Sequence, residues 1–426
     1  LPIRQRLKGY DARKLKADIK AGLSVTMLEL LQGMVYAGIA GLHLQFGTMC
    51  SAVSGMVGSL FGSSRYTVLG PTNATAFMIF SYFAADPHLD RVGMMPLLVF
   101  MVGTLLLFGA FLRVAELAQY ISRTVVVAYV TGSALLIIAN QSAHILGVSM
   151  QVTLNDGSVL QPRTMPGIMI HLVKSIQDMH WQSLATAGGT ALLYWLLRRV
   201  RPQWPALALS LIAASSSVFA LTGFGFEVPT YANARFGVWD LMPSFPDFAS
   251  PRFFSDFSRL FGLSVALAFL ATLEGSSMGK TLASVSGQRV DANQDMFSLG
   301  MANLSCAYLS GMPSSGSLTR SALNFQSGAR SPVSAFLNGA FCLIGALTLG
   351  HWVGFIPRAS LAVLIICVAL SLVSSRNIRI CLSATGSDAF VFLLTLAATL
   401  MVPLHVAIFT GVGVSVILYL RKASQP

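Results

Sequence analysis

Two polar segments of this chain have the composition of an anion-binding site. Each follows a stretch interrupted by glycine and proline, at 64–71 and 309–316, and each opens an unusually short predicted span, at 72–84 and 317–326. The polar starts of these segments consist of Thr72 and Asn73 in the first, and of Ser317, Leu318, Thr319 and Arg320 in the second. The first N–H groups of a helix have no partner within the helix, and this end of its dipole is positive. Two such helix starts together predict an anion site.

Arg320 lies one turn into the second segment, where a buried guanidinium would add fixed positive charge beside the anion. It could instead be the counter-charge of Glu274, or face away from the site. The hydroxyl groups of Ser317 and Thr319 could donate to the ligand or simply cap the helix, and the two roles are compatible.

Glu274 lies deep inside the apolar segment 258–279. Because a charge at the centre of a bilayer costs about 2.5–3.5 kcal/mol on insertion, we expect this carboxyl to face a cavity and to have a partner. It could carry a proton, or it could form a sodium site of oxygen ligands with Thr272, Ser276 and Ser277. The alternative is a hydrogen bond that only joins two helices.

The elements that must position these residues are predicted to be membrane-spanning helices. The 426 residues are 54% hydrophobic and 10% charged, with a mean hydropathy of +0.68, whereas about a quarter of the residues in soluble domains are charged. The length allows about 14 spans of roughly 20 residues, some of them shorter. We therefore predict an all-α polytopic membrane protein and exclude a soluble one.

The net charge of +12 does not indicate nucleic-acid binding, because the basic residues cluster at the ends of predicted spans. These clusters lie at 4–20, 198–201, 376–379 and 421–422. With the N-terminus inside and an even number of crossings, all of them fall on the cytoplasmic side. The pattern predicts a multi-pass protein of the inner (plasma) membrane with both termini in the cytoplasm, and it places Lys280 in a solvated cytoplasmic loop.

A repeated pattern divides the chain into two halves. Residues 100–137 and 336–372 share a phenylalanine, two glycines and an aromatic-Ile-x-Arg sequence at matching spacing, and Pro71 and Pro313 are related by a similar offset. Such repeats are typical of secondary transporters. Seven spans in each half would make the repeat inverted, with half-helices as spans 3 and 10. The predicted boundaries are a cytoplasmic segment at 1–20, repeats at 21–222 and 258–420, an extracytoplasmic loop at 223–257, and the start of a cytoplasmic tail at 421–426.

No pattern in the sequence indicates an enzyme or a metal site. We find no nucleophile–base pair, no phosphate-binding loop and no metal-ligand spacing. The five cysteines follow no disulfide pattern, and the seven histidines do not cluster. No cofactor is expected other than a co-transported proton or sodium ion.

Four motifs resemble those of the SulP (sulfate permease) anion transporters of the solute-carrier family 26 type. They are Gln32-Gly33-Met34-Val35-Tyr36-Ala37, Ser64-Arg65 with Gly70-Pro71-Thr72, Asn293-Gln294-Asp295 with Asn303, and Ser317-Leu318-Thr319-Arg320-Ser321. The resemblance covers nearly the whole chain, in order. Two departures are Leu31, where the family usually has proline, and the family's C-terminal STAS domain, which is not represented in this sequence.

The resemblance implies a core domain that moves against a gate domain, often in a homodimer, with sulfate, bicarbonate, chloride, oxalate or a dicarboxylate as cargo. It also implies that Gln32 and Tyr36 line the substrate cavity. Glu29 shares their helix face at a spacing of i, i+3 and i+7, and it could carry protons, pair with a cation or only form a salt bridge. Glu274 matches the acid of proton-coupled members, and Asn303 is expected to support interrupted backbone.

The resulting hypothesis is a secondary transporter that couples a small anion to protons through Glu274, by elevator-like alternating access. Sodium coupling and anion exchange remain open. A nucleobase permease is less favoured, because it would need carboxylates on both facing segments, where this chain has Arg320 and hydroxyl groups. A prestin-like motor would move charge without net uptake of the anion.

Overall fold

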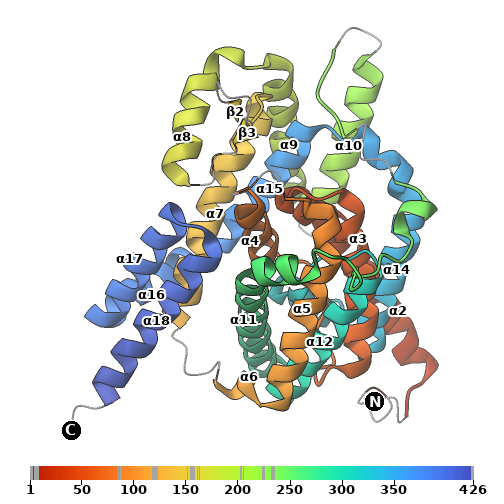
Figure 1. Ribbon diagram of the computed structural model, residues 1–426. Coiled ribbons are helices and arrows are strands. Elements are labelled where there is room, and N and C mark those ends of the chain that lie inside the picture. The colour runs from red at the N-terminus through yellow and green to blue at the C-terminus, as the bar shows by residue number, and fades with distance from the viewer. Residues whose placement is uncertain are drawn as a thin grey trace. The chain divides into compact units, whose positions relative to one another are not determined.

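The computed structural model is mostly helical (Figure 1). It describes residues 3, 9–84, 86, 89–117, 123–150, 152–153, 159–160, 162, 164–201, 204, 206–222, 226–231 and 236–423. Every predicted site residue falls within these ranges. Parts of four predicted elements lie outside the described residues, namely 4–8 of the first basic cluster, 118–122 of the first repeated pattern, 223–225 with 232–235 of the extracytoplasmic loop, and 424–426 of the tail.

Each predicted span coincides with a helix. In chain order these are α2 (Ala12–Ala40), α3 (Leu44–Phe61), α4 (Asn73–Phe83), α5 (Arg91–Phe111), α7 (Arg123–Leu146), α9 (Trp181–Val200), α10 (Ala206–Thr222), α11 (Phe253–Ser286), α12 (Ala292–Tyr308), α13 (Leu318–Gln326), α14 (Val333–Leu349), α15 (Arg358–Leu372), α17 (Gly386–Met401) and α18 (Leu404–Ala423). Among the described residues, 7 helical segments are long and apolar enough to cross a membrane. The total number of crossings and the inverted repeat stay predictions.

Some helices are longer than the predicted spans. α2 begins at Ala12 because Asp11 caps it, accepting a hydrogen bond from Lys14 N at 2.8 Å. α11 continues to Ser286 and ends at Gly287, whose φ of 69° is typical of a helix C-terminus. Lys280 therefore lies in a helix, and its predicted place in a loop is wrong.

Several short elements were not expected from the sequence. They are the helices α6 (Val114–Leu117), α8 (Met165–Lys174) and α16 (Ser375–Ala384), and the 3₁₀ turns η2 (Ser175–Asp178), η4 (Val238–Leu241) and η5 (Gly350–Phe355). The span predicted at 352–374 accordingly begins in η5 and becomes an α-helix only at Arg358.

The chain forms two compact units that do not correspond to its two halves. Unit 1 consists of Leu1–Ala76, Asp90–Gln119 and Phe236–His351, and unit 2 consists of Phe77–Leu89, Tyr120–Arg235 and Trp352–Pro426. Each unit therefore takes segments from both predicted repeats. All predicted site residues belong to unit 1.

Closely packed helices build unit 1. α12 packs on α5 and α3, and α14 packs on α3 and α2. Glycine permits the close approach of α2 and α3, since a Cβ on Gly33 would lie 2.7 Å from the carbonyl oxygen of Gly47. This packing buries the polar face of α2, on which Asp18 and Glu29 are fully buried.

The two interrupted stretches meet inside unit 1, as predicted. β1 (Leu69–Gly70) pairs antiparallel with β4 (Ser315–Gly316), with Leu69 opposite Gly316. Asn303 of α12 supports the second stretch, because Ser314 N donates to its Oδ1 at 2.9 Å and its Nδ2 donates to Ser314 O at 3.2 Å. The expected role of Asn303 is thus confirmed, and the ladder places the starts of α4 and α13 just beyond its paired strands.

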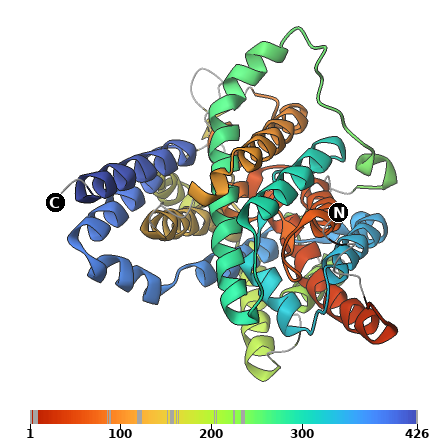
Figure 2. The ribbon, with the colours of Figure 1, turned by 90° about the horizontal axis from the view of Figure 1, so that it is seen from below.

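Unit 2 is a second helical assembly. α7 packs on α15 and α17, and α9 packs on α15 and α10. The hydroxyls of Thr190 and Ser360 are 2.9 Å apart and join α9 to α15. α17 and α18 lie side by side (Figure 2). A small hairpin of β2 (Val152–Thr153) and β3 (Val159–Leu160) follows α7.

Candidate functional site

Glu274 of α11 reaches the start of α4. Thr72, the residue before this helix, donates a hydrogen bond from Oγ1 to Glu274 Oε2 at 3.1 Å. The same hydroxyl oxygen accepts from Thr75 N at 3.4 Å and so caps α4. The partner of this in-span acid is therefore the hydroxyl group that caps α4.

Arg320 of α13 forms a fully buried ion pair with Glu29 of α2. Its Nη1 lies 2.8 Å from Glu29 Oε1, and both side chains are 0% exposed. Its Nη2 donates to Pro71 O at 2.9 Å, next to the start of α4. Of the alternatives left open by the sequence, the counter-charge of Arg320 is thus Glu29 and not Glu274.

The second oxygen of Glu29 is held from α14. Asn338 Nδ2 donates to Glu29 Oε2 at 2.5 Å. Asn338 Oδ1 accepts from Thr26 Oγ1 at 3.0 Å, which fixes the orientation of the amide. A side chain at Gly70 would overlap both Glu29 and Arg320, so only glycine fits beside the pair. Four elements therefore meet around one buried charge pair.

The remaining predicted residues differ in exposure. Gln32 and Tyr36 of α2 are buried, at 6% and 7%, and Tyr36 is within electrostatic reach of Arg320, Glu29 and Glu274. Thr72 and Asn73 are buried too, at 9% and 6%. The start of α4 thus lies near these charged groups, inside unit 1.

The start of α13 is more open. Ser317 caps α13, accepting from Arg320 N at 3.5 Å, and its hydroxyl lies 3.2 Å from that of Thr319. Leu318 is 44% exposed, and Thr319 is exposed as well. The residues at this helix start are therefore more exposed than those at the start of α4.

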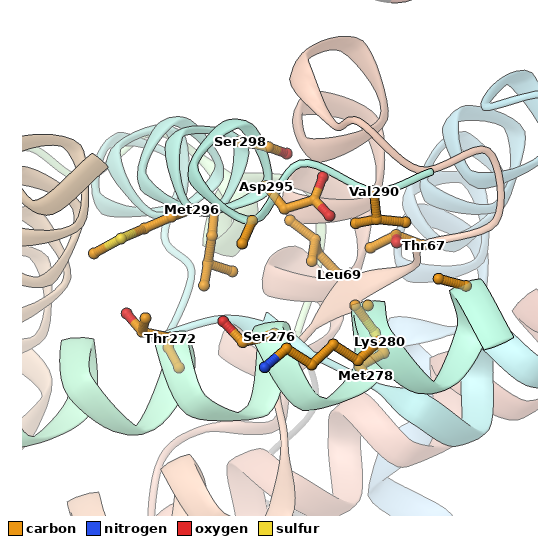
Figure 3. Close-up of a pocket in the computed structure, with 16 residues that line it drawn as sticks. Thr67, Leu69, Thr272, Ser276, Met278, Lys280, Val290, Asp295, Met296 and Ser298 are labelled. Carbon is orange, nitrogen blue, oxygen red and sulfur yellow. The ribbon is translucent and has the colours of Figure 1, made fainter. Parts of the chain in front are cut away.

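A cavity of about 150 Å³ between α11 and α12 was not predicted from the sequence (Figure 3). Thr272 and Ser276 line it from α11, and Asp295 and Met296 line it from α12. The hydroxyl of Thr272 donates to Ala268 O at 2.8 Å. Two of the hydroxyls considered for a sodium site thus line a cavity, whereas Glu274 turns to the start of α4.

Comparison with known proteins identifies the family. The model of the "Sulfate permease family" matches residues 15–395. Protein YvdB of Bacillus subtilis is 26% identical over 424 residues, which cover 99% of this chain and 76% of that protein. Sulfate transporter 4.1 of Arabidopsis thaliana is 25% identical over 414 residues, which cover 96% of this chain but only 59% of the plant protein. The chain thus spans about three fifths of the plant relative.

Solved structures share the fold. SLC26A9 superposes with a TM-score of 0.86 at 18% identity, covering 100% of this chain and 68% of that chain. The transmembrane domain of the cyanobacterial bicarbonate transporter BicA superposes with a TM-score of 0.75 at 17% identity, covering 95% of this chain and 98% of that domain. Together with the family match across most of the sequence, these likenesses confirm the resemblance found in the motifs. The chain belongs to the sulfate permease family of membrane anion transporters.

Proposed function

We propose that this chain is a secondary transporter that moves a small oxygen-rich anion together with protons. Sulfate, bicarbonate and dicarboxylates are the candidate cargoes, and Glu274 carries the proton. The observation that supports this proposal best is the hydrogen bond between Thr72 and Glu274, because it connects an in-span carboxyl to a helix start suited to anions. The names of the relatives agree with it, since they mention sulfate and bicarbonate.

The anion would bind at the starts of α4 and α13. Backbone N–H groups of Asn73, Leu318 and Thr319 are the donors, with the hydroxyls of Thr72 and Ser317 beside them; the N–H of Ser317 already donates to Val68 O at 3.4 Å. Asn73 Oδ1 is buried without a hydrogen-bond partner among the described residues. Because no described donor holds this oxygen, rotation of the amide would turn its N–H groups toward the anion. Gln32 and Tyr36 would line this anion site from α2.

The electrostatic attraction at this site would come mainly from helix dipoles. Because Arg320 is paired with Glu29, the two charges largely cancel, and the pair contributes little net charge beside the anion. We therefore assign Arg320 to support of the site, and we assign proton coupling to Glu274 before Glu29. A helix N-terminus stabilises a nearby anion by about 0.3–1 kcal/mol at an exposed position and by up to about 2 kcal/mol at a partly buried one.

The hydroxyl of Thr72 suits a partner whose protonation changes. It can donate to a carboxylate and accept from a carboxylic acid, so Glu274 can gain and lose a proton without losing this hydrogen bond. A membrane potential of 100 mV changes the free energy of transport by about 2.3 kcal/mol for each elementary charge that crosses the membrane. A proton that moves with the anion therefore changes the driving force for its transport substantially. Sodium coupling is the second candidate, weakened by the separate position of Thr272 and Ser276 along the α11 cavity.

The remaining parts of the proposal concern the whole protein. Unit 1, which holds every predicted site residue, would be the body that moves in an elevator-like cycle. Both termini would lie in the cytoplasm, which agrees with the distribution of basic residues. The proposal also includes a homodimer in the plasma membrane.

Uptake into proteoliposomes tests the proposal. Labelled sulfate, bicarbonate and fumarate are offered under imposed proton or sodium gradients to the wild type and to the Glu274→Gln variant. Glu227→Gln is the matched control, since Glu227 is an exposed carboxylate in a loop. We expect one anion to accumulate under the proton gradient in the wild type and in the control, and not in Glu274→Gln. Accumulation driven by sodium alone, or full proton stimulation in Glu274→Gln, would contradict it.

A further inference from the structure

Three side chains of α13 hold the backbone of the first interrupted stretch. Arg320 Nη2 donates to Pro71 O at 2.9 Å. Val68 N donates to Ser321 Oγ at 2.9 Å. Asn324 Nδ2 donates to Tyr66 O at 3.1 Å. All three side chains are fully buried, and together they hold the stretch at residues 66, 68 and 71, the last of these next to the start of α4.

This stretch depends on such partners. Only Leu69 and Gly70 pair with a strand, so most of its backbone groups have no regular secondary structure to satisfy them. Irregular backbone at membrane depth is stable only when protein groups replace water as its partners. The ring of Tyr66 also packs edge-on against Phe325, with centroids 4.9 Å apart. The side chains of α13 therefore supply what the two-residue ladder lacks.

The contacts of Ser321 and Asn324 indicate that these side chains hold the stretch 66–71 in place and do more than fill buried space. Ser321 Oγ also donates to Met278 Sδ at 3.3 Å, which ties α13 to α11, the helix of Glu274. Asn324 Oδ1 is buried and has no hydrogen-bond partner among the described residues. An amide with one orphaned oxygen is a poor way to fill a buried space. Its remaining role is the hydrogen bond that it donates to the stretch.

We propose that Ser321 and Asn324 are positioning residues of the anion site. By fixing the stretch 66–71 on α13, they set the separation between the starts of α4 and α13. The N–H groups of the two helices then converge on an anion of one size. This inference rests on the proposed function, because it requires an anion bound at both helix starts.

The test compares half-saturation concentrations and maximal uptake rates for sulfate and fumarate. Ser321→Ala and Asn324→Ala each remove one hydrogen bond to the stretch. Each is expected to raise the half-saturation concentration about tenfold, to leave the maximal rate within about twofold, and to change the ratio of the two half-saturation values. Gln326→Ala changes an exposed residue of the same helix and is the control.

The outcomes separate this inference from the proposed function. If the wild type takes up no anion, the proposed function fails and the inference falls with it. If the wild type transports and Ser321→Ala keeps wild-type half-saturation values, only the inference fails. Should Asn324→Ala not fold, Ser321→Ala decides alone, since it removes a single oxygen atom. A fall in maximal rate with unchanged half-saturation would also overturn the positioning role.

Discussion

The buried ion pair between Glu29 and Arg320 should respond differently to single and double substitution. Both side chains are 0% exposed, and their charged atoms are 2.8 Å apart. Removing one partner leaves an unpaired buried charge, which costs about 3–5 kcal/mol. We expect Glu29→Gln and Arg320→Met each to lower the free energy of unfolding by about this amount. The double variant has no buried charge and leaves only neutral groups unsatisfied, chiefly the Pro71 carbonyl and the new amide N–H groups at position 29, at a cost of about 1–3 kcal/mol.

Denaturant titration of the purified proteins in detergent gives the four free energies of this cycle. The double variant is expected to be more stable than either single variant, whereas the losses in the free energy of unfolding from two independent substitutions would add. Glu227→Gln, an exposed acid, should stay within about 0.5 kcal/mol of the wild type. Additive losses, with the double variant about 6–10 kcal/mol less stable than the wild type, would refute the reasoning. They would mean that the two charges do not compensate each other.

Three further outcomes follow from the geometry. Gly70→Ala should abolish uptake and lower the yield of folded protein, because its Cβ would overlap the buried ion pair, whereas Gly262→Ala, whose Cβ would meet nothing within 4 Å, should be neutral in both assays. Thr72→Val removes the donor to the in-span carboxyl and the cap of α4, and it should raise the half-saturation concentration for the anion about tenfold in uptake assays. Burial and the carboxylate of Asp18 raise the pKa of Tyr10, which precedes α2, from 10.0 to about 12. The folded state therefore holds this proton more tightly, and stability present below pH 10 is lost as the pH rises to about 12; alkaline denaturation of Tyr10→Phe should lack this part of the loss.

The crossing of the two interrupted stretches could be predicted because it depends on local signals. Glycine and proline break both apolar runs at matching offsets, and such backbone must be buried in protein. The starts of α4 and α13 followed from the same reasoning. The ladder that pairs Leu69 with Gly316 confirmed the crossing, although its register was not readable from either stretch alone.

The partner of Arg320 could not be identified from spacing. Glu29 lies 291 positions away, and Glu274 was an equally suitable acid on charge alone. Only the packing of α2, α13 and α14 decides which carboxyl meets the guanidinium. The available signal was that a fully buried arginine requires a counter-charge, and that these two acids both lie inside apolar helices.

The short elements were missed for a different reason. α16 is too short to span a membrane and mixes polar with apolar residues, so a search for long apolar runs passes over it. The start of α16 nevertheless has a signal in the sequence, because Ser374 caps the helix by accepting a hydrogen bond from Asn377 N. In the same way, Gly287 marks the end of α11 beyond Lys280. Capping residues would have corrected both boundaries.

Proton movement driven by the anion alone tests the central claim most directly. Proteoliposomes that contain a pH-sensitive dye, with no imposed pH gradient and with the membrane potential clamped, receive an inward gradient of the transported anion. For the wild type we predict acidification of the interior that follows anion entry, and for Glu274→Gln no acidification. Anion entry into wild-type vesicles without any change of internal pH would contradict proton coupling through Glu274.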